Sequence, residues 1–167
     1  MSIPSNISAY LDKNSVEYSH ILHPKTYSAE ETAHKVHCQK HEMAKILAVH
    51  LDRGDFLIII PANERLDMKL VRKSLHTKKV KLFSEKEMLR IFADCEVGAM
   101  PAFGNLYNLP VVAAHSLLED GHVYFNAGTH TDAIKCSISE FIKHSHPLFA
   151  TVSKLNKDNF VCRELSY

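Results

Sequence analysis

Two segments near the middle of the chain are almost continuously apolar, and a short polar stretch separates them. Residues 43–51 and 56–60 are dominated by aliphatic and β-branched side chains, whereas residues 52–55 read Asp-Arg-Gly-Asp. A glycine within a short polar run between two apolar runs is typical of a hairpin turn, and β-branched residues favour extended backbone. The pattern therefore predicts two neighbouring antiparallel strands.

Helix-starting signals precede several segments with an apolar face. In a capping box, a Ser side chain accepts a hydrogen bond from the backbone three residues later, where a Glu commonly stands. Ser28 with Glu31 and Ser84 with Glu87 fit this spacing. Helices are expected from Ser5 to just before Asn14, over 29–38, after Asp67 with Leu70, Val71 and Leu75 on one face, from Ser84 through Phe92, and from Ser139 and Glu140 to just before Pro147.

The remaining periodicity completes the expected architecture. Further strands are predicted at 17–22, 79–83, 110–114, 122–126 and 133–138, and residues 148–167 receive no assignment. Hairpins mixed with isolated helices favour an α+β fold, with a curved, mostly antiparallel mixed sheet flanked by helices, over a doubly wound parallel one. A length of 167 residues suits a single domain over 1–167.

The composition and charge of the chain exclude some classes of function. Hydrophobic residues make up 46% of the chain and the formal net charge is +1, which excludes a histone-like polycation, so any contact with nucleic acid must be local. No apolar run reaches the roughly twenty residues that cross a bilayer. The N-terminus lacks the pattern of a secretory signal, and Cys38, Cys95, Cys136 and Cys162 are scattered, so we expect a cytoplasmic protein with free thiols and no structural zinc.

Lys45 is the first candidate for chemistry. It interrupts a strand in which both faces are apolar, with Met43, Leu47 and Val49 on its own side. Burying an unpaired ammonium costs several kcal/mol, so a lysine here is expected to face a cleft and meet an anion. The alternative is that its stem crosses the core near a strand end while its ammonium reaches water.

Two loop segments are candidates for ligand binding through the backbone. Residues 98–104 read Gly-Ala-Met-Pro-Ala-Phe-Gly, and glycines let a backbone approach a ligand so that its N–H groups hold a carbonyl oxygen or an oxyanion. Residues 125–130 place Asn126 and Gly128 after a predicted strand, where they either bind a ligand or close a hairpin. Taken alone, each segment is equally typical of an ordinary turn.

Two further clusters have a functional and an ordinary interpretation. His34, His37, Cys38 and His41 recur at helical spacing and suggest a transition-metal site, but no carboxylate or second cysteine completes it. Between Asp67 and Glu85 there are six basic residues and no acidic one: Lys69, Arg72, Lys73, Lys78, Lys79 and Lys81. This basic strip is either a solvated surface or a docking surface for a phosphate backbone.

Taken in order, these motifs resemble the YbaK/EbsC family, the prolyl-tRNA-synthetase-associated editing domain, over about residues 28–141. The resemblance rests on the strand with Lys45, on 57–62 (Leu-Ile-Ile-Ile-Pro-Ala) followed by Leu66 and Asp67, on 97–107, on Leu109-Pro110-Val111, and on Phe125-Asn126-Ala127-Gly128-Thr129-His130-Thr131. It implies a metal-free and cofactor-free trans-editing deacylase that hydrolyses the ester of a mischarged aminoacyl-tRNA carrying a small amino acid such as Ala, Ser or Cys.

The resemblance also implies roles for individual residues. Lys45 and Gly98 fall on catalytic positions, with the lysine holding the phosphate and ribose of the terminal adenosine, and a water molecule attacks the ester. The substrate-binding positions are Ala99, Met100, Pro101, Ala102, Phe103, Gly104, Asn126 and Gly128. The implied partners are the tRNA acceptor end and an aminoacyl-tRNA synthetase, and the protein is expected to be a monomer or homodimer.

This chain departs from the family at two positions. Ala102 stands where the loop commonly carries a second proline, and Ala114 stands where the following strand commonly carries an aspartate. The alternative hypothesis is therefore a non-catalytic descendant that binds an aminoacyl-nucleotide, a tRNA end or a protein partner in a regulatory role.

Overall fold

The predicted hairpin forms the centre of the molecule. The computed structural model describes residues 2–157, and within them β2 (Ala44–Leu51) and β3 (Gly54–Pro61) pair antiparallel along their whole length. β3 is buried on both faces, since Leu57 and Ile59 belong to one apolar cluster while Ile58 and Ile60 belong to another. This explains why its sequence is a continuous apolar run rather than an alternating one.

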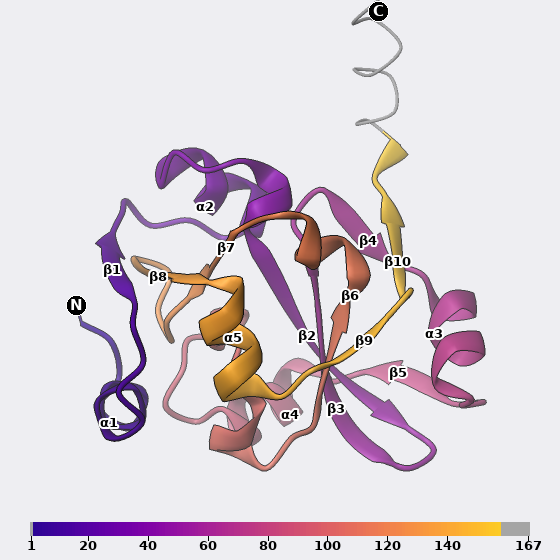
Figure 1. The fold of residues 1–167 in the computed structure, drawn as a ribbon. Helices are drawn as coiled ribbons and strands as arrows, with labels where there is room; N and C mark the ends of the chain where they lie inside the picture. Colours follow the sequence, from indigo (N-terminus) through magenta and orange to yellow (C-terminus); the bar gives the residue numbers. More distant parts are fainter. Residues whose placement is uncertain (1, 158–167) are drawn as a thin grey trace, which may run out of the picture.

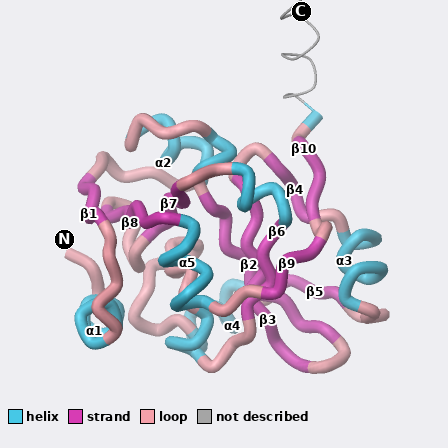
Figure 2. The backbone as a smooth tube through the Cα atoms, in the orientation of Figure 1, coloured by secondary structure: helices cyan, strands magenta, loops and turns pink. Residues whose placement is uncertain are grey.

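Three sheets organise the described chain (Figures 1 and 2). The five-stranded sheet has the order β5-β2-β3-β6-β9, the three-stranded sheet has the order β1-β8-β7, and β10 pairs with β4. β3 pairs in parallel with β6, β6 pairs in parallel with β9, and the other strand pairs are antiparallel. The mixed α+β architecture predicted from the sequence is therefore confirmed. The other strands are β1 (Ser19–Leu22), β4 (Glu64–Leu66), β5 (Val80–Leu82), β6 (Val111–Ala114), β7 (His122–Asn126), β8 (Asp132–Ser137), β9 (Leu148–Ala150) and β10 (Ser153–Leu155).

The larger apolar cluster fills the space between the five-stranded and three-stranded sheets. It joins one face of β2, β3 and β6 to Val123 and Phe125 of β7 and to Phe141 of α5. The second cluster lies on the opposite face of the five-stranded sheet, where Val71 and Leu75 of α3 cover Ile58 and Ile60. Burying these side chains stabilises the fold by about 25 cal/mol for each Å² of apolar surface removed from water. This burial also fixes the register of the central hairpin.

Three of the five α-helices in the described chain, α2, α3 and α4, begin at the capping residues that the sequence predicts, whereas α1 follows Pro4 without a side-chain cap. The helices are α1 (Ser5–Lys13), α2 (Ala29–Lys35), α3 (Met68–Leu75), α4 (Glu85–Ile91) and α5 (Ile138–Ser145). The side chains of Ser28, Asp67 and Ser84 each accept a hydrogen bond from the backbone N–H three residues later. His76 and His146 end α3 and α5 in the left-handed conformation, with φ of 49° and 46°.

Some boundaries differ from the sequence prediction for local reasons. α5 is capped by Ser137, whose Oγ accepts from the Glu140 N–H at 3.1 Å, so the helix begins before Ser139. α2 ends at Lys35 instead of residue 38 because His37 adopts a left-handed φ of 59°. Strands β4, β9 and β10 were not predicted, because these three-residue segments lack the alternation of apolar and polar residues that indicated β5.

Candidate active site

An open strand edge forms one wall of a cavity of about 250 Å³. β5 pairs only with Val49–Leu51 of β2, and Met43, directly before β2, forms a parallel bridge with Tyr124 of β7. Between these two contacts, residues 44–48 of β2 pair with no described strand along the side opposite β3. The cavity lies beside these residues, between α2, the loop after α4 and the end of β7. Its lining residues are Tyr27, Ser28, Ala29, Thr32, Ala44, Lys45, Ile46, Leu47, Gly98, Met100, Asn126 and His130.

Lys45 contributes a half-buried cation to this cavity. Its Nζ donates a hydrogen bond of 3.1 Å to the carbonyl oxygen of Glu64 in β4. Burial lowers the pKa of Lys45, and the nearby Glu30 carboxylate partly offsets this effect. An ammonium has three donors and no acceptor, so two N–H groups beyond the one used on Glu64 are free to meet an anion. The sequence expectation of a lysine beside a cleft agrees with this placement.

The main chain of Ile46 adds hydrogen-bonding groups to the same edge. The carbonyl oxygen of Ala48 accepts from the Phe83 N–H, so the backbone of Ala48 points away from β3. Hydrogen-bond directions alternate along an antiparallel strand, and the backbone N–H and C=O of Ile46 therefore also point away from β3. This places one donor and one acceptor of the strand edge beside the Lys45 side chain.

The glycine-rich loop faces the cavity only at two of its residues. Gly98 is exposed and adopts a φ of +85°, a conformation that L side chains rarely take. The Ala99 N–H donates to the Glu96 carbonyl, whereas within residues 2–157 the N–H groups of Gly98 and Met100 have no acceptor. Two backbone donors thus stand at the cavity wall, as backbone binding of a carbonyl oxygen requires.

The other loop residues lie in the interior. Of residues 98–104, predicted from the sequence to be catalytic or substrate-binding, only Gly98 and Met100 therefore line the cavity. Ala99, Pro101, Ala102, Phe103 and Gly104 are buried and do not line the cavity. The Ala102 carbonyl accepts from Ser145 Oγ at 2.9 Å, and Phe103 packs edge-to-face on Phe125. A Cβ on Gly104 would collide with the Leu109 carbonyl. These residues hold the loop against the core.

Gly128 supports the loop instead of lining the cavity. Its N–H donates to the Ala99 carbonyl at 2.8 Å, and its own carbonyl accepts from the Glu96 N–H at 2.8 Å. Asn126 does line the cavity, and within residues 2–157 its Oδ1 is buried with no hydrogen-bond partner. An unsatisfied buried acceptor costs about 1–3 kcal/mol, and a donor that reached this oxygen would remove that cost.

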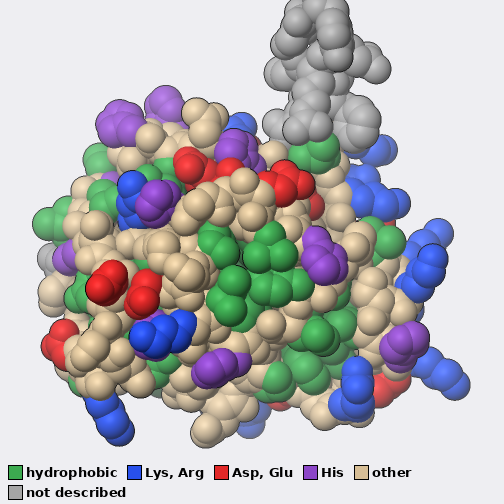
Figure 3. Space-filling model, in the orientation of Figure 1, with side chains coloured by type: hydrophobic (Ala, Val, Ile, Leu, Met, Phe, Trp, Pro, Cys, Tyr) green, Lys and Arg blue, Asp and Glu red, His purple; other side chains and the backbone are tan. Residues whose placement is uncertain are grey.

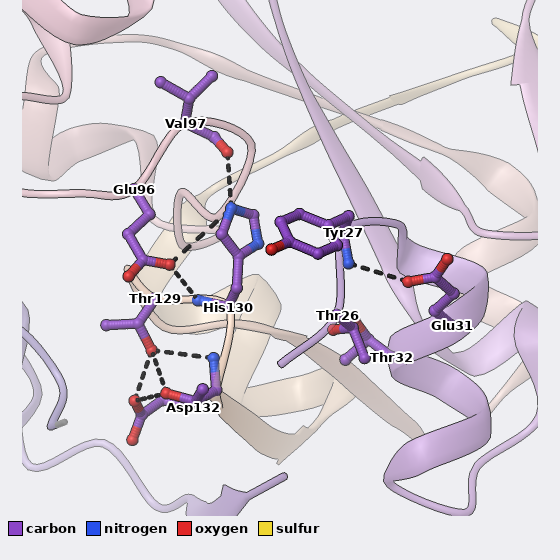
Figure 4. Close-up of polar contacts among 10 residues, drawn as sticks. Thr26, Tyr27, Glu31, Thr32, Glu96, Val97, Thr129, His130 and Asp132 are labelled. Atoms are coloured by element: carbon purple, nitrogen blue, oxygen red, sulfur yellow. Dashed lines mark hydrogen bonds and ion pairs between the residues drawn. The ribbon is translucent and has the colours of Figure 1, made fainter. Parts of the chain in front are cut away.

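A hydrogen-bonded hairpin loop positions His130 at the cavity (Figure 4). The backbone N–H of His130 donates to Glu96 Oε2 at 2.8 Å, and its Nε2 donates to the Val97 carbonyl at 2.9 Å. With Nε2 used as a donor, Nδ1 of the neutral ring is left as an acceptor. The ring lies 5.7 Å from that of Tyr27, centroid to centroid.

The base of this hairpin loop is tied to a buried carboxylate. Asp132 is fully buried and accepts hydrogen bonds from Thr129 Oγ1, Thr131 Oγ1 and His20 Nε2. Burial alone would raise the pKa of Asp132, but these hydrogen bonds outweigh it and lower the pKa. The network fixes the loop from which Asn126 and His130 reach the cavity.

Tyr27, Thr32 and His130 line the cavity but are not among the site residues predicted from the sequence. Tyr27 is 74% exposed at the mouth of the cavity, and its backbone N–H donates to Glu31 Oε2 at 3.0 Å. Tyr27 precedes the cap of α2, Thr32 lies within α2, and His130 lies in the β7–β8 hairpin loop. In the sequence, the signal for Tyr27 is a large aromatic residue directly before Ser28, the cap of a helix.

The basic strip lies outside the cavity. Lys69, Arg72 and Lys73 are exposed on α3, and Lys78 and Lys79 are exposed just before β5. Arg72 Nε donates to the Lys78 carbonyl. Asp52 accepts from the backbone N–H groups of Lys78 and Lys79 at 2.7 and 3.0 Å, which places a carboxylate beside these two lysines.

The histidine and cysteine cluster does not assemble into a metal centre. His34, Cys38 and His41 line a separate cavity beyond α2, without His37. Among residues 2–157, no three His, Cys, Asp or Glu side chains are placed to hold a metal ion. Cys38, Cys95 and Cys136 are free thiols, and burial raises the pKa of each to about 12. Cys162 lies outside the described residues. No helix in the described part is long and apolar enough to span a membrane.

The chain is similar to known proteins in sequence and in fold. Residues 23–144 match the aminoacyl-tRNA editing domain. Among solved structures, the fold is similar to that of a candidate trans-editing enzyme for prolyl tRNA synthetase, with a TM-score of 0.80, 18% identity and coverage of 92% of this chain and 98% of that one. A protein described only as hypothetical matches with a TM-score of 0.79, 21% identity and coverage of 90% and 100%.

A longer protein also contains this fold. A candidate signal transduction protein of Marinobacter aquaeolei matches with a TM-score of 0.72 and 16% identity over 95% of this chain but only 32% of that protein. No curated protein matches this chain.

The match to the family model thus defines the class of protein. Because the matched segment covers well over half of the sequence, the chain belongs to the aminoacyl-tRNA editing domain family. The resemblance found in the sequence is confirmed, and family membership supports an aminoacyl-tRNA deacylase type of function.

Proposed function

We propose that this protein is a trans-editing deacylase that hydrolyses the ester bond of a mischarged aminoacyl-tRNA in the cytoplasm. The observation that carries the proposal is the meeting of three groups in one cavity. The Lys45 ammonium, the free N–H groups of Gly98 and Met100, and the strand edge at Ile46 all border the same space. A cation and backbone donors side by side suit a ligand that has both a phosphate and an acyl ester.

Each group has a distinct role in this proposal. Lys45 binds the phosphate and ribose of the terminal nucleotide, and the N–H groups of Gly98 and Met100 hold the acyl carbonyl oxygen and stabilise the negative charge that develops on it. The oxygen of a water molecule bonds to the acyl carbon, the bond between that carbon and the ribose oxygen breaks, and the ribose oxygen takes up a proton. The products are the free amino acid and the tRNA.

The substrate amino acid in this proposal is small. The cavity of about 250 Å³ must hold the aminoacyl group together with part of the terminal adenosine, which favours Ala, Ser or Cys over bulky side chains. Asn126, with its unpaired buried Oδ1, binds the substrate, and Gly128 holds the loop. Lys69, Arg72, Lys73, Lys78 and Lys79 bind the tRNA backbone, and association with an aminoacyl-tRNA synthetase supplies the substrate.

Release of labelled amino acid from a panel of mischarged tRNAs tests the proposal. The panel includes tRNA for proline charged with alanine, serine or cysteine, and wild-type protein is compared with Lys45→Ala. Lys35→Ala is the matched control, since Lys35 is an exposed lysine of α2 that does not line the cavity. We expect release above background that is lost in Lys45→Ala and kept in Lys35→Ala.

The same assay decides on the non-catalytic alternative, which Ala102 and Ala114 motivate. Wild-type protein that binds tRNA but releases no amino acid from any member of the panel would favour a binding protein. Release that persists at the wild-type rate in Lys45→Ala would remove Lys45 from the site.

A further inference from the structure

An exposed arginine, Arg65, follows Glu64, the residue whose carbonyl oxygen Lys45 contacts. Lys45 Nζ donates to the carbonyl oxygen of Glu64, and Arg65 is the next residue, with its Cα two covalent bonds beyond that carbonyl carbon. Glu64 is buried at 8% exposure, whereas Arg65 is exposed. The backbone therefore leads directly from the half-buried cation in the cavity to a cation in solvent.

The β4–β10 ribbon places a second positive charge opposite Arg65. The register pairs Arg65 with Lys154, and directly opposed residues of an antiparallel pair lie on the same face with Cβ atoms about 5 Å apart. Like charges at such positions are destabilising. Lys154 Nζ is held by Asp67 Oδ2 at 3.1 Å, whereas within residues 2–157 the Arg65 guanidinium has no hydrogen bond or ion pair. Arg65 therefore lacks an anionic partner.

Helix α3 continues the positive surface away from the ribbon. It begins directly after its cap Asp67, and it exposes Lys69 and Lys73 four residues apart on one side. Neither lysine forms an ion pair in the described chain. Lys and Arg side chains gather on the side of the molecule where α3 and β10 lie (Figure 3).

The two ends of the basic strip differ in their relation to the cavity. Lys78 and Lys79 precede β5, which pairs with the far end of β2, about 20 Å along the strand from Lys45 at about 3.3 Å per residue. They also lie beside the Asp52 carboxylate. Arg65 adjoins the Lys45 contact; the nearby Glu64 and Asp67 carboxylates bind Ser153 and Lys154, and neither forms an ion pair with Arg65 in the described chain.

We infer that Arg65, with Lys69 and Lys73, binds the phosphate backbone of the tRNA acceptor stem where it leaves the cavity. This inference rests on the proposed function, because it assumes that the terminal nucleotide occupies the cavity beside Lys45. A guanidinium presents a planar fork of donors that matches a phosphate, and such a contact positions the nucleic acid without reading its sequence. Arg65 is thus the link between the cavity and the basic strip.

The test measures binding of uncharged tRNA by the full-length protein across a salt series. We expect Arg65→Ala to weaken tRNA binding about tenfold, the size of one charge-assisted hydrogen bond. It also lowers the slope of log K against log salt by about one, as loss of a single phosphate contact does. Lys143→Ala, which removes an exposed cation from α5, leaves both quantities unchanged.

Hydrolysis of two substrates separates this inference from the proposed function. Arg65→Ala lowers kcat/KM about tenfold on mischarged tRNA and leaves it unchanged on an aminoacyl-adenosine, which carries no stem phosphates. If wild-type protein hydrolyses neither substrate while Arg65→Ala still weakens tRNA binding, the proposed function fails and this inference stands.

Three results would overturn the inference. The first is tRNA binding by Arg65→Ala with wild-type affinity and salt slope, and the second is an absence of tRNA binding by the wild type. The third is a loss of binding to vesicles of anionic lipid in Arg65→Ala with tRNA binding unchanged, which would assign the surface to a membrane.

Discussion

The hydroxyl of Ser153 donates a hydrogen bond of 2.8 Å to Oε1 of Glu64. Strand β10 is therefore attached to the residue whose carbonyl oxygen accepts from Lys45. Asn156 extends this attachment, since its Nδ2 donates to Glu30 Oε1 of α2 and its backbone N–H donates to the Asn63 carbonyl. The C-terminal part of the described chain thus contacts both α2 and the Glu64 residue that Lys45 contacts.

Removing the Ser153 hydroxyl is expected to destabilise the protein. In Ser153→Ala the buried Glu64 carboxylate loses a donor, which costs about 1–3 kcal/mol in the free energy of unfolding. Urea denaturation measures this loss. Ser153→Thr keeps a hydroxyl and is expected to retain most of the stability, whereas an unchanged midpoint in Ser153→Ala would show that water replaces the bond.

Only part of this region could be predicted from the sequence, because its strands β4 and β10 are short. Capping residues identified α2, α3 and α4 because the cap and the helix are adjacent in the chain, and an ammonium within an apolar strand identified Lys45. β4 and β10 have three residues each and pair across 89 positions, as the Ser153 bond to Glu64 shows. No local pattern encodes such a contact.

The candidate site shows the same division. The composition of residues 98–104 indicated a special loop, but it could not tell that Gly98 and Met100 face the cavity while Ala102 and Phe103 face the core. That distinction depends on Ser145, Phe125 and Gly128, which contact the loop from distant segments. His130 likewise reaches the cavity only because Glu96 and Val97 hold it.

Stability is expected to depend on pH through His50. Its Nδ1 lies 2.6 Å from Asp55 Oδ1 and its Nε2 lies 2.9 Å from Glu87 Oε2. The hydrogen bond with Glu87 is the main cause that raises the pKa of His50 above 6.5, and desolvation opposes it. Because the folded pKa is the higher one, this contribution is complete below pH 6.5 and is lost as the pH rises through the folded value.

Glu87 sets the acid side of the same profile. Its hydrogen bond with His50 is the main cause that lowers its pKa from 4.5 to about 2, so its contribution is present above pH 4.5 and is lost as the pH falls toward 2. Urea midpoints measured from pH 3 to 9 are expected to peak between these limits. His50→Gln flattens the profile, and His122→Gln, at an exposed histidine, does not. An unaltered profile in His50→Gln would contradict this assignment.

Gly98 is expected to be sensitive to substitution because of its backbone conformation. A Cβ there would meet only His130 Cε1 at 3.9 Å, so space is available, but the φ of +85° costs an L residue about 1–2 kcal/mol. Gly98→Ala is expected to lower unfolding stability by that amount or to turn the loop donors, reducing deacylation. Gly121→Ala is the control, since nothing lies within 4 Å of its Cβ position. Equal effects at both positions would refute the argument.

Restoring an aspartate at position 114 is not expected to increase hydrolysis. Ala114 is 2% exposed within an apolar cluster that includes Val112 and Ala150, and it does not line the cavity. Ala114→Asp buries a carboxylate among apolar side chains, which costs about 3 kcal/mol or more at neutral pH and less in acid, where the group is protonated. Ala114→Asn introduces a side chain of nearly the same size without a charge, so its comparison with Ala114→Asp shows how much of the lost stability is due to the charge. A gain in amino-acid release by Ala114→Asp would contradict this expectation.

His76 and His146 end α3 and α5 in the left-handed backbone conformation. The steric cost of this conformation lowers the free energy of unfolding. Glycine at His76 or His146 would relieve the steric cost of a positive φ, and after allowing for the backbone entropy that glycine loses on folding, each replacement is expected to add about 0.5–1 kcal/mol. Both side chains are exposed. The double variant would therefore offer a more tolerant background, in which costly substitutions around the cavity remain folded and their effects on chemistry can be measured apart from their effects on stability.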